Sequence, residues 1–180
     1  MRNGQHRLQS EELMQSTTIR VTLDPVRFDR EAHMIWWYEI RNEPSVRAVS
    51  RSRKKIKADE HKAWWQASAA LATRKLYFIR RHDGVHEPQV VGFARLDDRG
   101  GWTEVSIALV PEWRGQKIGS TAIRSLLVEA ANIGFPPVGA VINAQNQARL
   151  ALFFRAGFVL KRKGFVQVMV PTKKPTRRPL

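Results

Sequence analysis

Apolar residues recur along the chain at helical and strand-like spacings in turn, which is typical of a mixed α/β domain. In the first half, helical spacing predicts helices over residues 29–41 and 59–73. Alternating apolar and polar positions predict strands over residues 18–23, 75–81, 90–97 and 102–110. Glycine-containing turns at 83–84 and 100–101 separate the last three strands, so we expect these to form an antiparallel meander. The first strand has the pattern of a sheet edge.

The second half of the chain continues this alternation of helices and strands. Its predicted helices cover residues 119–131 and 146–156, and its predicted strands cover 138–142, 158–161 and 165–170. The last two strands are expected to pair across the turn at 163–164. We therefore expect one α/β (α+β) domain over residues 17–171, with about seven strands and about four helices. Residues 1–16 and the basic tail 172–180 are predicted to be disordered.

The composition fits a globular chain with a core. Of its 180 residues, 43% are hydrophobic, yet no apolar run reaches the roughly 18 residues that a membrane-spanning helix needs. The chain has no cysteine, which excludes disulfides, thiolate nucleophiles and cysteine-ligated zinc. The polar N-terminus lacks the apolar core of a signal peptide, so we expect a cytoplasmic protein. We also expect no bound metal.

The charge is strongly positive. Lysine and arginine number 31 against 16 aspartates and glutamates, giving a formal net charge of +15. One acid-free basic stretch covers residues 47–57, and no acidic residue follows Glu129. Such a field attracts polyanions, which include nucleic acid, anionic lipid and phosphate-bearing small molecules. A solvated basic surface and a patch that serves an anionic ligand both remain open.

Residues 107–123 combine a strand, a proline, a short loop and the start of a helix. A loop that enters a helix amino end leaves backbone N–H groups unpaired and adds the positive end of the helix dipole. Gly115 and Gly119 permit close approach to this backbone. Arg114 and Lys117 add positive charge, so the segment fits a pyrophosphate. The fingerprints of P-loop and dinucleotide-binding folds are absent.

Three stretches of the chain resemble the GNAT superfamily of N-acetyltransferases. The acetyl-CoA loop of that family is similar to PEWRGQKIGS at residues 111–120, although Lys117 stands where a glycine is usual. The last core helix resembles NQARLALFFRAGF at 146–158, and the third strand resembles VVGFARL at 90–96. The resemblance spans about residues 18–170. It implies a mixed, mostly antiparallel sheet, splayed between strands four and five, with acetyl-CoA in the split as cosubstrate.

The resemblance also implies which residues hold the cosubstrate. Pantetheine would pair with the backbone of Ile107, Leu109 and Val110, while Asn146 and Phe153 would also contact it. The pyrophosphate would lie on Arg114, Gly115, Gln116, Lys117, Ile118, Gly119 and Ser120. Asn146 is equally suited to be a plain helix N-cap. Phe153 occupies the position where many relatives carry a tyrosine that protonates the leaving thiolate.

Direct transfer to an amine needs a base and an aligned acceptor. Glu104 is the candidate base, since it lies early in the fourth strand, where some relatives carry a catalytic glutamate. Strand alternation places it on one face with Ser106 and Ala108. A solvent-facing glutamate is the alternative. Tyr77 is a candidate acid if it faces the cleft, and core packing is the alternative for Tyr77.

Residues 40–50 and 56–65 indicate the acceptor. They resemble a GNAT subgroup that acetylates the 4-amino group of nucleotide-linked deoxysugars, as in pseudaminic acid biosynthesis. By that resemblance, the acceptor would be bound by Arg41, Arg47, His61 and Trp65. Because arginine pairs well with a diphosphate, an anionic amine acceptor suits this set.

Two other hypotheses remain beside a small or nucleotide-linked amine. The acceptor pattern is also near that of ribosomal-protein N-terminal acetyltransferases, so the chain could acetylate proteins and approach the ribosome or nucleic acid through its charge. Alternatively, the chain could bind acyl-CoA or nucleic acid without catalysis, which Lys117 and Phe153 would favour. A monomer and a homodimer are both compatible with the sequence.

Overall fold

The computed structural model describes residues 19–50, 52–143, 145–160 and, for the backbone alone, 166–170. The strands are β1 (Arg20–Pro25), β2 (Arg74–His82), β3 (Gln89–Asp98), β4 (Thr103–Leu109), β5 (Val138–Ile142) and β6 (Val166–Val170). The helices are α2 (Glu31–Asn42), α3 (Pro44–Ala48), α4 (Ala58–Ala69), the 3-10 helix η1 (Pro111–Trp113), α5 (Ile118–Asn132) and α6 (Gln147–Arg155).

The described strands form a single six-stranded sheet in the order β1-β2-β3-β4-β5-β6. All neighbours run antiparallel except β4 and β5, which are parallel. This arrangement confirms the mixed, mostly antiparallel sheet, the edge position of β1 and the meander of β2, β3 and β4. Of the strand expected over 158–161, the described residues 158–160 form only a bridge at Leu160, so the described part of the chain has six strands rather than about seven. The predicted turn at 163–164 lies outside the described residues.

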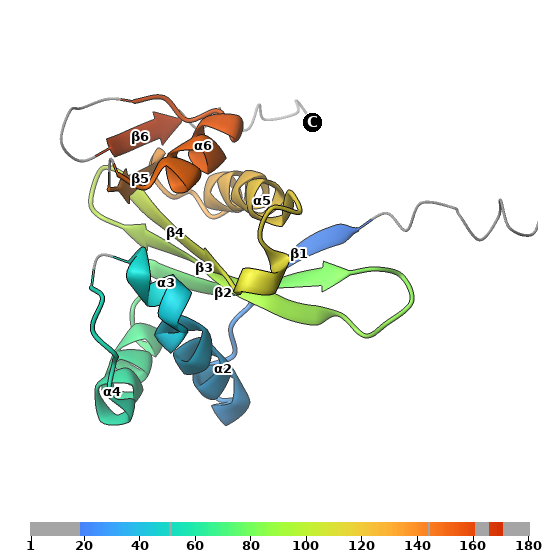
Figure 1. Cartoon of the computed structure of the whole chain (residues 1–180). Helices are drawn as coiled ribbons and strands as arrows, with labels where there is room; N and C mark the ends of the chain where they lie inside the picture. The colour runs from blue at the N-terminus through green and yellow to red at the C-terminus, as the bar shows by residue number, and fades with distance from the viewer. Residues whose placement is uncertain (1–18, 51, 144, 161–165, 171–180) are drawn as a thin grey trace, which may run out of the picture.

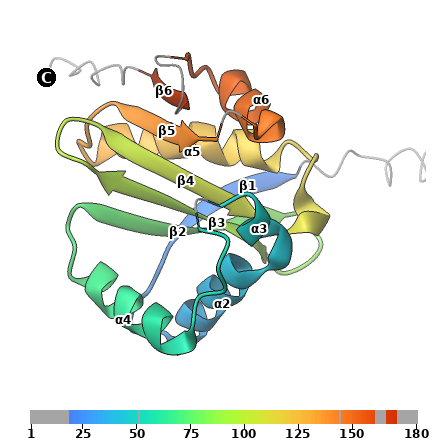
Figure 2. The ribbon, with the colours of Figure 1, turned by 60° about the vertical axis from the view of Figure 1, so that its left-hand side comes forward.

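Helices cover both faces of the sheet. α5 and α6 lie on one face, whereas α2 and α4 lie on the other with α3 beside α2 (Figure 1, Figure 2). Under α5 the core is largely aliphatic, as at Ile123 and Leu126. Under α2 and α4 it is aromatic, with Trp37 stacked on Phe93 at 4.2 Å between ring centroids. The two faces therefore differ in chemistry as well as in helix number.

α3 is a helix where the sequence predicts only a basic loop. Pro44, which ends the helical pattern before it, is also the first residue of α3, a position that tolerates the missing N–H of proline. Glu43 caps the new helix, since its carboxylate accepts a hydrogen bond from the Val46 amide at 2.8 Å. The structure thus describes five α-helices rather than about four. α4 also ends at Ala69, earlier than the predicted residue 73.

Candidate active site

The parallel strands β4 and β5 pair only where they begin. Their register joins Thr103 to Val138 and Glu104 to Gly139, and within the described residues it goes no further. The rest of β4, as far as Leu109, stays paired with β3 on its other side. The predicted split between the fourth and fifth strands is therefore confirmed, and Figure 1 shows β5 and β6 diverging from β4.

Backbone alternation decides which groups of β4 face this split. The Val110 amide donates to the Val91 carbonyl at 3.1 Å, so even-numbered positions point toward β3. The backbone groups of Ile107 and Leu109 consequently point toward the split, although the Leu109 carbonyl already accepts two hydrogen bonds from Arg114. The Val110 carbonyl accepts from the Trp113 amide at 3.2 Å, so both backbone groups of Val110 are engaged. The prediction that Val110 pairs with pantetheine is therefore wrong.

The loop before α5 forms a positively polarised backbone cradle. Lys117 directly precedes α5 with a φ of 62°, in the left-handed region that glycine adopts most easily. In the described chain, no side chain caps the amino end of α5. The hydroxyls of Ser120 and Thr121 donate back to the Lys117 carbonyl, at 2.8 and 3.2 Å. The first-turn amides, which lack partners inside a helix, are thus open to an anion.

Buried glycine and isoleucine complete the cradle by packing. A Cβ at Gly119 would lie 3.3 Å from a Leu152 methyl carbon and 3.5 Å from one of Leu109, so glycine lets α5 approach α6 and β4 closely. Ile118 is buried as well, and its side chain belongs to the core under α5. Gly115, with a φ of 78°, makes the turn that leads to Lys117. These features fit a diphosphate held by backbone amides.

Two side chains expected to hold the pyrophosphate instead brace their own loop. Arg114 donates to the Leu109 carbonyl from Nε at 3.0 Å and from Nη2 at 2.9 Å. Its Nη2 also donates to Ser45 Oγ at 2.7 Å, which ties the end of β4 to α3. Gln116 donates from Nε2 to the Glu112 carbonyl at 2.9 Å. Their place in the motif therefore reflects loop geometry.

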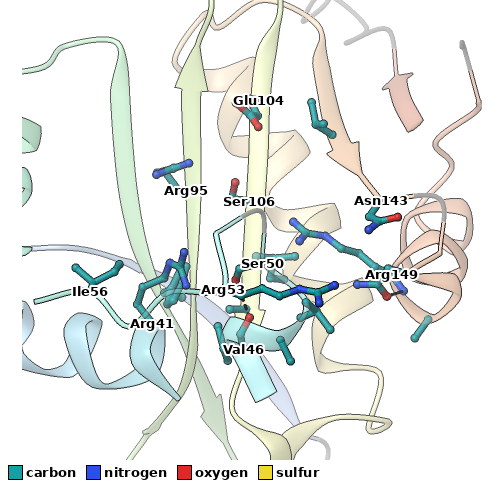
Figure 3. Close-up of a pocket in the computed structure, with 18 of the residues that line it drawn as sticks. Arg41, Val46, Ser50, Arg53, Ile56, Arg95, Glu104, Ser106, Asn143 and Arg149 are labelled. Carbon is teal, nitrogen blue, oxygen red and sulfur yellow. Dashed lines mark hydrogen bonds between the residues drawn. The ribbon is translucent and has the colours of Figure 1, made fainter. Parts of the chain in front are cut away.

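A cleft of about 1110 Å³ opens between the split and the α2–α4 side of the sheet. Glu104, Ser106 and Ala108 all line it, which confirms that they share a face (Figure 3). The cationic side chains that line it are Arg41, Arg53, Arg95 and Arg149. Glu104 is the single acidic residue among the described residues of the lining. The cleft is therefore electropositive as a whole.

Glu104 lies where β4 and β5 separate, and an ion network holds it there. Its carboxylate accepts from Arg99 Nη2 at 2.6 Å and from Nε at 3.0 Å. Asp97, opposite Glu104 in the β3–β4 register, pairs with Arg74 at 2.6 Å and Arg95 at 2.8 Å. Only 10% of the Glu104 side chain is exposed, so the solvent-facing alternative is wrong. Its carboxylate is positioned at the apex of the split.

Tyr77 and Phe153 lie in the core on the α5 face rather than in the cleft lining. The Tyr77 hydroxyl donates to Glu129 Oε1 at 3.1 Å, and burial, aided by the Glu129 charge, raises the pKa of Tyr77 above its usual range. Phe153 is fully buried and packs edge-on against Phe158 at 4.9 Å. Core packing, the alternative for Tyr77, is thus what the structure shows. Neither side chain reaches the position expected for an acid or a cosubstrate contact.

Of the two arginines predicted to bind the acceptor, only Arg41 lines the cleft. Arg47 braces the segment that follows α2, donating from Nε to the Asn42 carbonyl and from Nη1 to the Arg53 carbonyl, each at 3.0 Å. Arg53, which the sequence analysis did not single out, lines the cleft instead. The basic stretch in the sequence was the signal for it, but only the fold shows which member points inward.

His61 also lines the cleft, whereas Trp65 does not. His61 Nε2 lies 3.0 Å from the Met34 carbonyl, and burial lowers the pKa of His61, so the ring is neutral near pH 7. Trp65 is buried and donates its indole N–H to the Phe28 carbonyl at 3.3 Å. Trp64 lines the cleft in its place, because neighbouring residues on a helix point about 100° apart.

Asn146 is the N-cap of α6 and also lines the cleft. Its Oδ1 accepts a hydrogen bond from the Arg149 amide at 3.0 Å, which confirms the capping alternative. Arg149 extends from α6 into the cleft (Figure 3) and was not predicted as a site residue. Arg95 was missed as well, since its direction follows from the register of β3 with β4.

The described helices include none that is long and apolar enough to cross a membrane. Nor do histidine and acidic side chains gather in threes anywhere in the described part to form a possible metal site.

Comparison with known proteins agrees with this geometry. A family model for the acetyltransferase (GNAT) domain matches residues 20–159. A domain from Methanocaldococcus jannaschii DSM 2661 has a similar structure, with a TM-score of 0.73 and 19% identity over 85% of this chain and 99% of that one. Spermidine N-acetyltransferase from Vibrio cholerae, in complex with CoA and spermine, has a TM-score of 0.68 and 14% identity, over 86% of this chain and 96% of that one. An aminoglycoside acetyltransferase in complex with coenzyme A has a TM-score of 0.69 and 15% identity, over 84% of this chain and 95% of that one.

No curated protein sequence is significantly similar to the chain. At identities of 14–19%, the solved structures establish the fold alone. The family model, however, covers most of the chain, including the split, the cradle before α5 and α6. The chain therefore belongs to the GNAT family of acetyltransferases, with acetyl-CoA as the cosubstrate.

Proposed function

We propose that this protein transfers an acetyl group from acetyl-CoA directly to the primary amine of a nucleotide-linked amino sugar. The observation that supports it most is the placement of three features along β4 and the loop that follows it. These are the open edge of β4, the uncapped amino end of α5 and the Glu104 carboxylate at the apex. Bound acetyl-CoA supplies a reactive thioester, so positioning and deprotonation of the amine suffice for transfer.

The roles of the chain's own groups follow from their positions. The backbone of Ile107 and the amide of Leu109 hold pantetheine, and the amides at Lys117–Ser120 hold the pyrophosphate. Glu104 accepts the proton of the acceptor ammonium, directly or through a water. Among the described residues the cleft lining contains no tyrosine, so the leaving thiolate departs unprotonated or takes its proton from solvent.

The acceptor class is supported by the sequence pattern around Arg41 and by the charge of the cleft. The two related enzymes described above act on spermidine and on aminoglycosides, which carry several positive charges. Four arginines against one carboxylate disfavour such an acceptor here and favour one that carries phosphate. Trp64, which is stacked on the buried His61, offers an aromatic surface against which a base or sugar ring packs.

Release of coenzyme A from acetyl-CoA tests the proposal, with a UDP-linked 4-amino-deoxysugar, a basic peptide and spermidine as separate acceptors. We expect turnover with the sugar nucleotide and none above background with spermidine. Turnover with spermidine alone would overturn the acceptor class. Absence of transfer with every acceptor, despite tight binding of coenzyme A, would favour a module that binds acyl-CoA without catalysis.

A protein substrate is the second candidate. Lys54, Lys55 and Lys57 are exposed on the segment whose Arg53 and Ile56 line the cleft, so a basic surface surrounds its entrance. Such a surface would help the protein approach ribosomal RNA, at a cost in affinity as salt is added. Acetylation of intact ribosomes that falls steeply with salt, together with silence toward the sugar nucleotide, would favour this candidate.

A further inference from the structure

We infer that Arg41 and Arg53 form an anion-binding subsite at the acceptor end of the cleft, for a phosphate or carboxylate carried by the amine. The inference rests on the proposed function and assigns its specificity to two residues. The neighbouring Arg47 is excluded because both of its described donors are bound to backbone carbonyls.

Arg41 is the first half of this subsite. It lies in the last turn of α2 and is half-buried, with Nη1 fully enclosed and without a hydrogen-bond partner. Its single described bond is a long one, from Nη2 to the Ser52 carbonyl at 3.4 Å. Burial, and then the charge of Arg47, lowers the pKa of Arg41. A buried guanidinium is ordinarily paired with a carboxylate, so an unpaired one that lines a cleft calls for a ligand's negative charge.

Arg53 is the second half, and its backbone is held in place. Asn42, at the end of α2, donates to the Ile56 carbonyl at 3.1 Å and accepts from the Ile56 amide at 2.8 Å. Arg47 holds the Arg53 carbonyl at 3.0 Å. These bonds pin the segment 53–56 to the end of α2, beside Arg41. Arg53 is therefore presented by a braced segment rather than by a free chain, whereas Arg41 is presented by α2.

The surroundings of the pair contain no competing carboxylate. No ion pair recorded within the described residues involves Arg41 or Arg53. The only described acid of the cleft lining, Glu104, is bonded to Arg99. Figure 3 shows Arg53 extending into the cleft from the braced loop while Arg149 extends into it from α6. Arg41 and Arg53 therefore add positive charge on the α2 side of the cleft and Arg149 adds it on the α6 side, so an anion would be attracted and a polyamine repelled.

Titration calorimetry with uridine diphosphate tests the subsite, using protein first saturated with coenzyme A so that the cradle before α5 is filled. The variants are Arg41→Met and Arg53→Met, which keep an apolar stem of similar length. Arg155→Met is the matched control, because it removes one exposed arginine of α6 that does not line the cleft. Since Arg53 is exposed, its variant is informative even where Arg41→Met fails to fold.

We expect each subsite variant to weaken uridine diphosphate binding at least about tenfold, the loss of one charge-assisted hydrogen bond, while coenzyme A binds as before. Arg155→Met is expected to change the affinity for uridine diphosphate less than about twofold, because it removes only a screened surface charge. Equal effects of the three variants, or none, would overturn the subsite. If coenzyme A itself does not bind, the proposed function fails. Titration of uridine diphosphate into the coenzyme-free wild type and into each variant then still decides whether the subsite exists.

Discussion

Backbone groups are what β4 offers toward the split and the start of α5 offers beyond it, whereas the wall of the cleft formed by α2, α3, α4 and residues 49–57 offers side chains. Along β4, the amide and carbonyl of Ile107 and the amide of Leu109 face the split, and the first-turn amides of α5 follow beyond the loop. On the second wall, Arg41, Arg53 and Trp64 do the lining. A backbone wall suits a cosubstrate that never changes, and a side-chain wall can be altered to suit different acceptors.

Lys117 illustrates this difference. It replaces a glycine of the family pattern, yet its φ of 62° preserves the left-handed turn that exposes the α5 amides. A backbone site therefore survives a change of side chain. By contrast, the side-chain wall changes its chemistry with each substitution, so its arginines carry the specificity.

The largest effect is expected where the two walls meet, at Glu104. Glu104→Gln keeps the shape and hydrogen-bonding capacity of the side chain but removes the base, and we expect kcat to fall about 10²–10⁴-fold. Steady-state kinetics with the sugar nucleotide measures it. Tyr77→Phe is the matched control on the other face of the sheet and is expected to leave kcat within about twofold, because its hydroxyl bonds only Glu129 among described groups.

Equal kcat for Glu104→Gln and the wild type would remove Glu104 from the chemistry. A large kcat loss in Tyr77→Phe would show that Tyr77 reaches the cleft in solution, contrary to its buried position.

The helical layer of the side-chain wall is expected to weaken in acid. Burial lowers the pKa of His33, as do the nearby Arg30, Arg80 and Arg27, so the folded state binds this proton less readily than the unfolded chain. The free energy of unfolding should therefore be highest above the ordinary histidine pKa and fall as the pH drops below it. His33 Nδ1 also accepts a hydrogen bond from the Arg27 amide at 3.0 Å, and its loss on protonation costs about 1–3 kcal/mol.

Urea denaturation between pH 7.5 and 5.5 measures this dependence. His33→Asn, which keeps an acceptor near Nδ1 but does not titrate, should flatten the slope. His61 continues to contribute, since burial lowers its pKa too. An unchanged slope in His33→Asn would contradict the account.

The smallest effect is expected at Lys117, because the cradle is built from backbone. Lys117→Gly removes one charge near the helix amino end and should raise the KM for acetyl-CoA about two- to fivefold. Lys117→Ala, the control, loses the same charge, so its KM for acetyl-CoA should match that of Lys117→Gly. It keeps a non-glycine residue in the left-handed region, so its free energy of unfolding should lie about 1 kcal/mol below that of Lys117→Gly. A rise in KM of more than about a hundredfold would mean that the lysine side chain holds the pyrophosphate.

The backbone wall could be predicted from the sequence because its signals are local. The strand, the proline, the glycines and the helix start lie within residues 107–123, and strand alternation alone places Glu104 with Ser106. Tyr77 was misplaced because the face of one strand relative to another depends on register. Its partner in β3 is Ala94, on the face opposite Glu104.

The side-chain wall could be predicted only in part, at Arg41 and His61, because the rest of its geometry is tertiary. Trp64 and Trp65 differ only in the rotation of α4 about its axis, which packing decides. Whether Arg47 or Arg53 lines the cleft depends on α3, which contains Arg47. Whether α3 forms depends on whether Pro44 ends one helix or begins the next. Charge indicated an anionic partner, while the fold alone shows which arginines remain available for it.

Hydrogen–deuterium exchange of backbone amides, with and without coenzyme A, tests the division between the two walls most directly. The account predicts slower exchange in peptides spanning residues 105–121 on addition of coenzyme A. Peptides spanning residues 41–56 should change only when uridine diphosphate is added to the coenzyme A complex. Protection by coenzyme A over 41–56 without protection over 105–121 would contradict the account.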